Sequence, residues 1–225
     1  MMMIQAIQKV TMQNGMPALR LDAAALLDEI YVCEDMPEII HESLSGVITW
    51  QQRNETNLAR FVAGPRQFPA FALALLACGA VAQVGDEEMC LNTYFMERQK
   101  EKAAAVLLPV DVPGMRLAAA RVGLTPAGED IVRAAACVVI KDGVVSDARL
   151  AMNGVWQGRQ WMSETMEGLV GNLLTDEAIQ AAGKAVAAEV DPPSDHLGSA
   201  AYRCAMAGVL TRQVLEACQQ GGQND

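Results

Sequence analysis

The sequence predicts an α+β protein built from two modest domains, and three observations support this prediction. The chain has 225 residues, which is more than one average domain and less than two large ones. The segment 111–114, Asp-Val-Pro-Gly, has the composition of a domain boundary. Beyond it, the strongest hairpin signal of the chain precedes two helical segments. With 52% hydrophobic and 20% charged residues, the chain has enough apolar side chains to bury a core.

The first part of the chain predicts a strand followed by a helix. Residues 1–15 lack clear periodicity and are expected to form an N-terminal arm. Residues 18–22 alternate apolar and polar side chains, which is typical of a strand. Pro37, with Glu38 behind it, predicts the start of a helix. The buried face of this helix is expected to be Ile39, Ile40, Leu44 and Val47.

The next segments predict a buried helix and a hairpin. A polar stretch, 51–57, leads to Gly64-Pro65, which ends any continuing helix. Residues 69–78 are almost entirely apolar and predict a second helix that ends at Gly79. Two short apolar segments, 80–84 and 89–91, flank Gly85-Asp86 and predict a hairpin. Residues 106–110 predict a further strand.

The second half predicts an antiparallel sheet, expected to have three strands, packed by two helices. Residues 134–140 and 144–152 flank Asp142-Gly143, a dipeptide typical of a tight hairpin turn. Thr175 and Ser199 are good N-caps for the two helices that follow. The first helix is expected to bury Ile179, Ala182, Val186 and Val190 and to stop before Pro192-Pro193. The second is expected to bury Tyr202, Met206, Leu210 and Val214 and to end near Gly221.

The charge balance and the cysteine spacing exclude several functional classes. A net charge of −10 and a pI near 4.7 argue against nucleic acid or an anionic membrane surface as a partner. The longest apolar run, 71–82, is too short to span a bilayer, and residues 1–10 carry no secretory signal. The six cysteines form no CxxC pair, so we predict no metal site and expect a cytoplasmic chain with reduced thiols.

Candidate catalytic residues are scarce. His41 and His196 are the two histidines, and neither has a carboxylate, cysteine or histidine at ligand spacing. We therefore interpret both as structural or surface residues. The sequence contains no GxSxG, Walker or GxGxxG motif. No catalytic residue is predicted.

Two blocks of the second half carry a family resemblance. The first is Asp142–Ala151 with Asn153-Gly154-Val155; the second is Asp191–His196, continuing to Ser199–Arg203 and Val209-Leu210. In order and spacing they resemble the C-terminal domain of the FAD-binding flavoprotein subunits of molybdenum hydroxylases. This family includes the medium subunits of carbon monoxide dehydrogenase and bacterial xanthine dehydrogenase. Upstream, residues 18–23, Arg53-Asn54 and 75–80 resemble the same family, without a gap from Arg53 to Ala80.

The resemblance implies a fold, a role and partners. It implies the remnant of a two-subdomain FAD-binding (PCMH-type) domain at 16–111, truncated at its N-terminus. A three-stranded antiparallel sheet with helices follows at 112–220, like the C-terminal domain of the carbon monoxide dehydrogenase flavoprotein, with a tail at 221–225. In the family such a subunit passes electrons from an iron–sulfur subunit through FAD to an acceptor such as NAD. The implied partners are the iron–sulfur and molybdopterin subunits of a complex of the xanthine dehydrogenase type.

The implied FAD-binding residues depart from the family pattern. Residues Thr56, Asn57, Leu58, Ala59, Arg60 and Phe61 match the family's Thr-Ile-Gly-Gly-Asn loop and its preceding residue. Such a loop needs glycines so that backbone N–H groups approach the phosphates closely. Here a methyl group and two bulky side chains replace small residues. Two family aspartates fall on Ala70 and Gly79, and the family's first Ala-Gly-Gly-x-Asp loop has no counterpart in residues 1–15. A second place for flavin contact is 123–130, which matches the family stretch near the isoalloxazine.

These observations leave two functional hypotheses. In the first, the chain is a component of a molybdenum hydroxylase with a degenerate FAD site. It is then an oxidoreductase subunit if it keeps flavin, and otherwise a non-catalytic docking or scaffold subunit. In the alternative, it is a free-standing module that reuses the fold to bind a small ligand or a protein, without redox chemistry.

Overall fold

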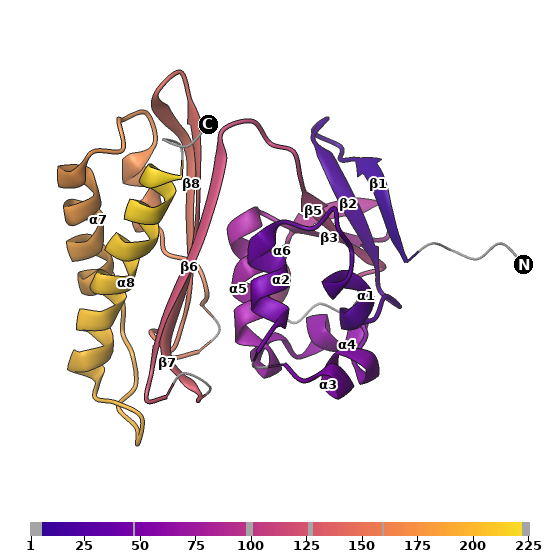
Figure 1. Cartoon of the computed structure of the whole chain (residues 1–225), viewed down its shortest axis with the longest axis horizontal. Helices are drawn as coiled ribbons and strands as arrows, with labels where there is room; N and C mark the ends of the chain where they lie inside the picture. Colours follow the sequence, from indigo (N-terminus) through magenta and orange to yellow (C-terminus); the bar gives the residue numbers. More distant parts are fainter. Residues whose placement is uncertain (1–5, 47, 98–100, 126–127, 159, 222–225) are drawn as a thin grey trace, which may run out of the picture. The chain divides into compact units, whose positions relative to one another are not determined.

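The structure is a computed structural model that describes residues 6–46, 48–97, 101–125, 128–158 and 160–221. The chain divides into two compact units, residues 1–112 and 113–225 (Figure 1). Each unit contains one antiparallel sheet and several helices. The predicted α+β class is therefore confirmed. Within the described residues, no helix combines the length and the apolar character needed to cross a membrane.

The first unit is built on a five-stranded sheet in which every pair of neighbours is antiparallel. The spatial order is β1-β2-β5-β3-β4. The central strand is buried along its whole length, whereas the edge strand β1 is half-buried or exposed. The strands are β1 (Ile7–Thr11), β2 (Pro17–Asp22), β3 (Val81–Val84), β4 (Glu87–Cys90) and β5 (Ala105–Pro109).

Short helices gather on one side of this sheet (Figure 1). Helix α5 buries Phe71 to Cys78, because it packs against both α2 and the sheet. It ends at Gly79, which adopts the left-handed conformation (φ 75°) favoured by glycine. The helices are α1 (Leu27–Tyr31), α2 (Glu38–Leu44), α3 (Trp50–Glu55), α4 (Leu58–Ala63), α5 (Pro69–Cys78) and α6 (Leu91–Met96), with the 3₁₀ helix η1 (Pro65–Gln67).

Most predicted elements of this unit are present. The strands at 18–22 and 106–110, the hairpin at 80–91 and the helix at 69–78 are confirmed. Helix α2 begins after Pro37, and three of its four expected core residues are buried; the fourth, Val47, lies outside the described residues.

Two predictions about this unit are corrected. Residues 7–11 belong to the expected arm but form β1, because a turn with Gly15 (φ 84°) folds them onto β2. The polar stretch 51–57 is not only a connection: it forms most of α3 and ends at Asn57, the N-cap of α4. Helix α3 buries no residue and is held by a capping box between Thr49 and Gln52, so it shows no apolar period in the sequence.

The second unit is a three-stranded sheet covered on one face by two helices that lie side by side (Figure 1). The hairpin turn is Asp142-Gly143, and both residues have positive φ, 52° and 80°, as a type I′ turn requires. The predicted hairpin, third strand and two helices are confirmed. The elements are β6 (Met115–Gly123), β7 (Asp130–Lys141), β8 (Val144–Asn153), the 3₁₀ helix η2 (Thr165–Leu169), α7 (Asp176–Glu189) and α8 (Ala200–Gln220).

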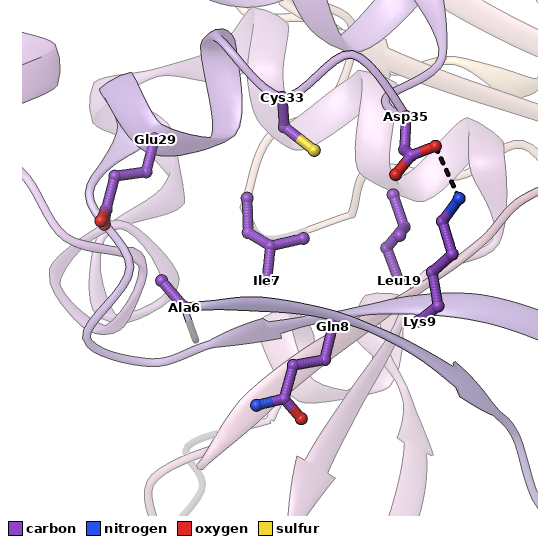
Figure 2. Close-up of a pocket in the computed structure, with 8 residues that line it drawn as sticks. All are labelled: Ala6, Ile7, Gln8, Lys9, Leu19, Glu29, Cys33 and Asp35. Carbon is purple, nitrogen blue, oxygen red and sulfur yellow. Dashed lines mark hydrogen bonds and ion pairs between the residues drawn. The ribbon is translucent and has the colours of Figure 1, made fainter. Parts of the chain in front are cut away.

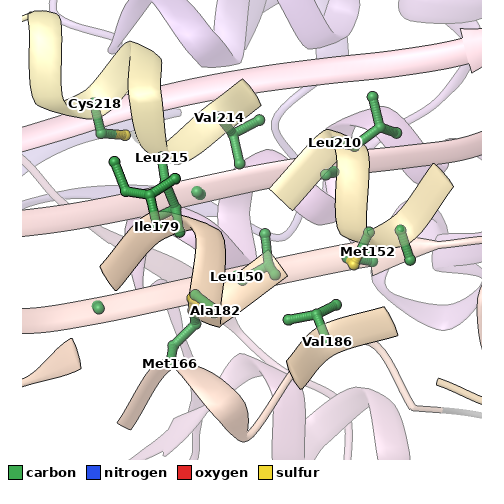
Figure 3. Close-up of a cluster of buried hydrophobic side chains, with 14 of the residues drawn as sticks. Leu150, Met152, Met166, Ile179, Ala182, Val186, Leu210, Val214, Leu215 and Cys218 are labelled. Carbon is green, nitrogen blue, oxygen red and sulfur yellow. The ribbon is translucent and has the colours of Figure 1, made fainter. Parts of the chain in front are cut away.

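The core of this unit lies between the sheet and the two helices. Figure 3 shows aliphatic side chains from β8, α7 and α8 converging there, among them Leu150, Val186 and Leu210. The two helices approach closely where Gly183 faces Gly208: a Cβ on Gly208 would lie 2.7 Å from the carbonyl oxygen of Gly183. Because these two glycines have no side chains, the backbones of α7 and α8 can approach each other here.

The predicted inner face of α8 is partly wrong. Leu210 and Val214 are buried as expected, but Tyr202 is 40% exposed and Met206 is only half-buried. Arg203 is buried instead, at 3% exposure, because its guanidinium binds groups inside the unit. The buried face of α8 therefore includes Arg203 and differs from the face that the spacing of apolar residues predicts.

Candidate functional site

The segment expected to contact FAD, Thr56–Phe61, is a capped turn of helix. Asn57 is the N-cap of α4, and Leu58 begins the helix. Leu58 and Phe61 are buried, whereas Ala59 and Arg60 face solvent. Thr56 is buried and accepts a hydrogen bond from the N–H of Leu27 at its carbonyl oxygen. The six residues are consecutive and therefore lie together, but they do not form an open loop of the kind that glycines allow.

Four successive backbone N–H groups of this segment have acceptors within the protein. Leu58 donates to the carbonyl of Ala25 at 2.8 Å, and Ala59 donates to that of Ala23 at 2.8 Å. The N–H of Arg60 reaches the side-chain oxygen of Asn57 at 2.9 Å, and that of Phe61 reaches its carbonyl oxygen at 3.1 Å. A phosphate site needs converging N–H groups that are free to donate. Residues 58–61 offer none.

The ring of Phe61 anchors the same segment in the core. It is fully buried, and its centroid lies 4.6 Å from that of Phe71 on α5 and 6.2 Å from that of Phe95 on α6. Aromatic pairs at such separations stabilise beyond their buried area. The family loop that this segment resembles has an asparagine at this position, whereas here the side chain is part of the hydrophobic core.

Ala70 and Gly79, which stand where the family has aspartates, provide no polar group either. Ala70 is the second residue of α5 and is half-buried. Gly79 ends that helix with φ 75°, a conformation that glycine adopts without strain. Both positions serve the helix itself.

Arg53, from the matching Arg-Asn pair, joins three helices. Its Nε lies 3.0 Å from Oδ1 of Asp28, and its Nη1 donates to the carbonyls of Leu44 and Ile48. The guanidinium also stacks on Tyr31, with its central carbon 4.1 Å from the ring centroid. This matching residue has a structural role.

An ion-pair cluster lies at the end of the second expected contact region, 123–130. Asp130 is paired with Arg121 at 2.5 Å and with Arg133 at 2.6 Å. Arg121 also donates to the carbonyl of Gly128, so it ties the β6–β7 connection to β6. Residues 126 and 127 lie outside the described residues. Flavin contact here stays a prediction.

The second motif block of the C-terminal unit is also held by a charged pair. Arg203 donates two hydrogen bonds to the carboxylate of Asp195, at 2.7 and 2.8 Å, and one to the carbonyl of Gly154 at 3.0 Å. Hydrogen bonding from Arg203, followed by that from the N–H of Leu197, holds the pKa of Asp195 below its ordinary value. The block thereby joins the start of α8 to the end of β8.

A pocket of about 660 Å³ lies between β1 and the segment that follows α1 (Figure 2). Ile7 and Leu19 project into it from the sheet, and the Cys33 thiol faces them from above. At one end Lys9 Nζ lies 2.7 Å from Asp35 Oδ1. The sequence does not reveal this pocket, because residues 7–11 show no clear periodicity and form β1 only through the hairpin with β2.

The two histidines form no catalytic constellation in the described structure. His41 has its Nδ1 2.8 Å from the carbonyl oxygen of Tyr31, which agrees with a structural role. His196 lies exposed in the loop before α8. Within the described ranges, no group of three or more His, Cys, Asp or Glu residues is arranged to hold a metal ion.

In sequence, most of the C-terminal unit is similar to a flavoprotein domain. Residues 127–218 match the family described as CO dehydrogenase flavoprotein C-terminal domain. The uncharacterized protein YgfM of Escherichia coli (strain K12) is 26% identical over 215 residues, which cover 95% of this chain and 77% of that protein. The glyceraldehyde dehydrogenase medium chain of Sulfolobus acidocaldarius is 29% identical over 82 residues, 36% of this chain and 29% of that one.

Solved structures share the fold. Carbon monoxide dehydrogenase from Hydrogenophaga pseudoflava superposes with a TM-score of 0.80 at 19% identity, covering 96% of this chain and 78% of that chain. Quinoline 2-oxidoreductase from Pseudomonas putida 86 gives a TM-score of 0.74 at 18% identity, covering 95% and 78%. The family match and the medium-chain relative support the resemblance to FAD-binding subunits of molybdenum hydroxylases, and the solved structures show the same fold.

Proposed function

We propose that this chain, which resembles the FAD-binding subunits of molybdenum hydroxylases in sequence and fold, is the corresponding component of such a complex. Its role is to dock with an iron–sulfur subunit and a molybdopterin subunit in an assembly of the xanthine dehydrogenase type. We expect this assembly in the cytoplasm, with no part in nucleic-acid or membrane binding.

The observation that carries this proposal is the C-terminal unit. Its two motif blocks lie within the match to the CO dehydrogenase flavoprotein C-terminal domain. The residues of these blocks hold the unit together through Arg203, Asp195 and Gly154, so the matching positions serve a common architecture. A chain that keeps this architecture keeps the shape that a partner subunit would recognise.

Electron transfer is a separate part of the family role. FAD is the cofactor that the resemblance implies, and a flavin-loaded subunit would relay electrons to an acceptor such as NAD. We expect docking to be independent of flavin. The proposal therefore concerns assembly, and the absence of a catalytic constellation among the described residues does not weaken it.

Affinity purification of the tagged full chain from its native cells tests the proposal. We expect iron–sulfur and molybdopterin subunits in the eluate, identified by mass spectrometry, with iron and molybdenum in fixed ratio to the chain. An Arg203→Met variant, which removes the link between α8 and β8, is expected to lose these partners. The same tag on an unrelated cytoplasmic protein controls for background. A monomer that elutes without either subunit would contradict the proposal.

The alternative, a free-standing module for a small ligand, is favoured by the pocket beside β1. Its apolar floor and its ionic end are features of small-molecule sites. Native mass spectrometry of the chain purified from its own cells distinguishes the two functions. A stoichiometric small molecule on an otherwise monomeric chain would favour the alternative.

A further inference from the structure

We infer that residues 56–61 form a closed structural turn that does not bind the pyrophosphate of FAD. Oxygen atoms of the chain itself accept the backbone hydrogen bonds that phosphate oxygens would otherwise accept. The acceptors are the side-chain and main-chain oxygens of Asn57 and the carbonyls of Ala23 and Ala25. The inference concerns whether this segment can bind the cofactor and goes beyond the docking role.

The first step is the hydrogen bonding. Anion sites made by backbone work because several N–H groups point at one place and lack an internal partner. In this segment Leu58 and Ala59 are tied to the stretch 23–25, and the next two N–H groups are tied to Asn57. Leu26 and Asn57 also form an isolated antiparallel bridge. The segment is thus paired like a short strand on one side and capped like a helix on the other.

The second step is packing. Releasing the donors of Leu58 and Ala59 would move α4 away from residues 23–25. Leu58 is 1% exposed and Phe61 is fully buried between Phe71 and Phe95, so that movement would pull both side chains out of the core. A flavin would have to replace this packing as well as the hydrogen bonds.

The third step is charge. Arg60 is exposed on the first turn of α4 and is the cation that this segment offers to a phosphate. One solvent-exposed guanidinium binds an anion weakly, because water and salt screen it. It does not replace a set of converging, desolvated N–H donors. The chemistry of the segment therefore does not fit the group that the resemblance implies.

Amide hydrogen exchange and flavin titration of the full chain test this inference together. We expect no absorbance bands near 370 and 450 nm, no saturable binding of added FAD, and slow exchange in peptides that span 57–61. One-to-one FAD binding that changes exchange in these peptides would overturn the inference. FAD bound with exchange at 57–61 unchanged would place the flavin elsewhere and leave the turn closed, as inferred.

Two asparagines of the same region supply a matched pair of variants. Asn57→Ala removes the oxygen that accepts from Arg60 and is expected to speed exchange of 58–61 about five- to tenfold, the effect of losing a helix cap. Asn54→Ala removes a side chain that donates to Trp50 at the surface and is expected to leave 58–61 unchanged. Equal exchange in both variants would contradict the role of Asn57. Asn57→Ser keeps an accepting oxygen and guards against a folding defect.

The inference and the docking proposal fail in different ways. A complex that assembles without flavin supports both. A complex that assembles with FAD on residues 56–61 overturns the inference alone, and a flavin-free monomer overturns the docking proposal alone.

Discussion

The crossing of α7 and α8 predicts that a single methyl group in the wrong place destabilises the C-terminal unit. We consider Gly208→Ala. The added Cβ would lie 2.7 Å from the carbonyl oxygen of Gly183 and 3.1 Å from Cβ of Ala187. Neither neighbour is the end of a flexible side chain, so the helices have to separate.

The expected magnitude is the balance of two effects. Replacing glycine by alanine inside a helix ordinarily stabilises by about 1 kcal/mol, because the backbone of glycine loses more entropy on folding. Overpacking a well-fitted core costs about 1–3 kcal/mol, and a Cβ only 2.7 Å from a backbone oxygen puts the cost in the upper part of that range, about 2–3 kcal/mol. We therefore expect Gly208→Ala to lower the free energy of unfolding by about 1–2 kcal/mol.

Urea unfolding, followed by far-UV circular dichroism and by fluorescence, measures this change. With a slope of about 2 kcal/mol per molar urea, the midpoint of the C-terminal transition is expected to fall by about 0.5–1 M. Trp156 and Trp161 lie in the affected unit and Trp50 in the other, so the two transitions are separable by Trp50→Phe.

The matched control is Gly168→Ala in η2, where an added Cβ meets nothing within 4 Å. This variant is expected to be as stable as the unaltered chain or slightly more stable. If Gly208→Ala and Gly168→Ala unfold at the same urea concentration, the close approach of the two helices has no energetic weight and the reasoning is refuted.

Three further predictions concern buried polar groups and thiols of the same unit. Arg203→Met removes the donor to the carbonyls of Ile131 and Gly154 and is expected to lower the free energy of unfolding by about 3 kcal/mol. The control is Arg212→Met, whose partner is the exposed Gln180 and which is expected to cost less than about 1 kcal/mol. Equal urea midpoints for the two variants would contradict this prediction. Asp130→Asn removes the carboxylate shared by Arg121 and Arg133 and is expected to cost about 1–3 kcal/mol. Asp147→Asn, at a carboxylate that is 48% exposed against 9% for Asp130, is expected to cost under about 0.5 kcal/mol; thermal unfolding compares the two. Burial raises the pKa of the Cys218 thiol to about 12 from 9.0. The protonated thiol therefore contributes fully to the stability of the folded state below pH 9, and this stability falls by about 1.4 kcal/mol per pH unit as the pH rises towards 12. Between pH 8 and pH 10 the unaltered chain is therefore expected to lose more stability than Cys218→Ala, and parallel pH profiles would refute the assignment.

The elements that the sequence predicts well are those with local signals. The turn Asp142-Gly143 needs positive φ at both residues, and the caps Thr175 and Ser199 accept hydrogen bonds from the N–H groups of Ala178 and Tyr202. Each signal is complete within four residues. No knowledge of the rest of the chain is needed to recognise it.

The features that escape prediction have no apolar pattern of their own. Strand β1 has little burial of its own and exists because β2 pairs with it. Helix α3 has no buried face to recognise. On α8, an arginine occupies a core position because a carboxylate eight residues earlier neutralises it, which no apolar pattern reveals.

For the candidate flavin segment, too, one part of the result can be predicted from the sequence and another cannot. The loss of glycines at 59 and 60 is visible in the sequence and suffices to question the site. The reason for closure is not visible there: the acceptors for Leu58 and Ala59 are carbonyl oxygens of residues 25 and 23, more than thirty positions away. The pocket beside β1 is hidden for the same reason, because its walls come from β1, β2 and the segment after α1.

Arg53 has a consequence for how relatives of this chain are identified. Its guanidinium contacts Asp28, two backbone carbonyls and the ring of Tyr31, all within the protein. An Arg-Asn pair found at this point in a new sequence therefore reports a shared scaffold and carries no information about cargo. In this chain the residue that matches the family at position 53 supports the scaffold, so its presence alone is no evidence that a flavin is bound.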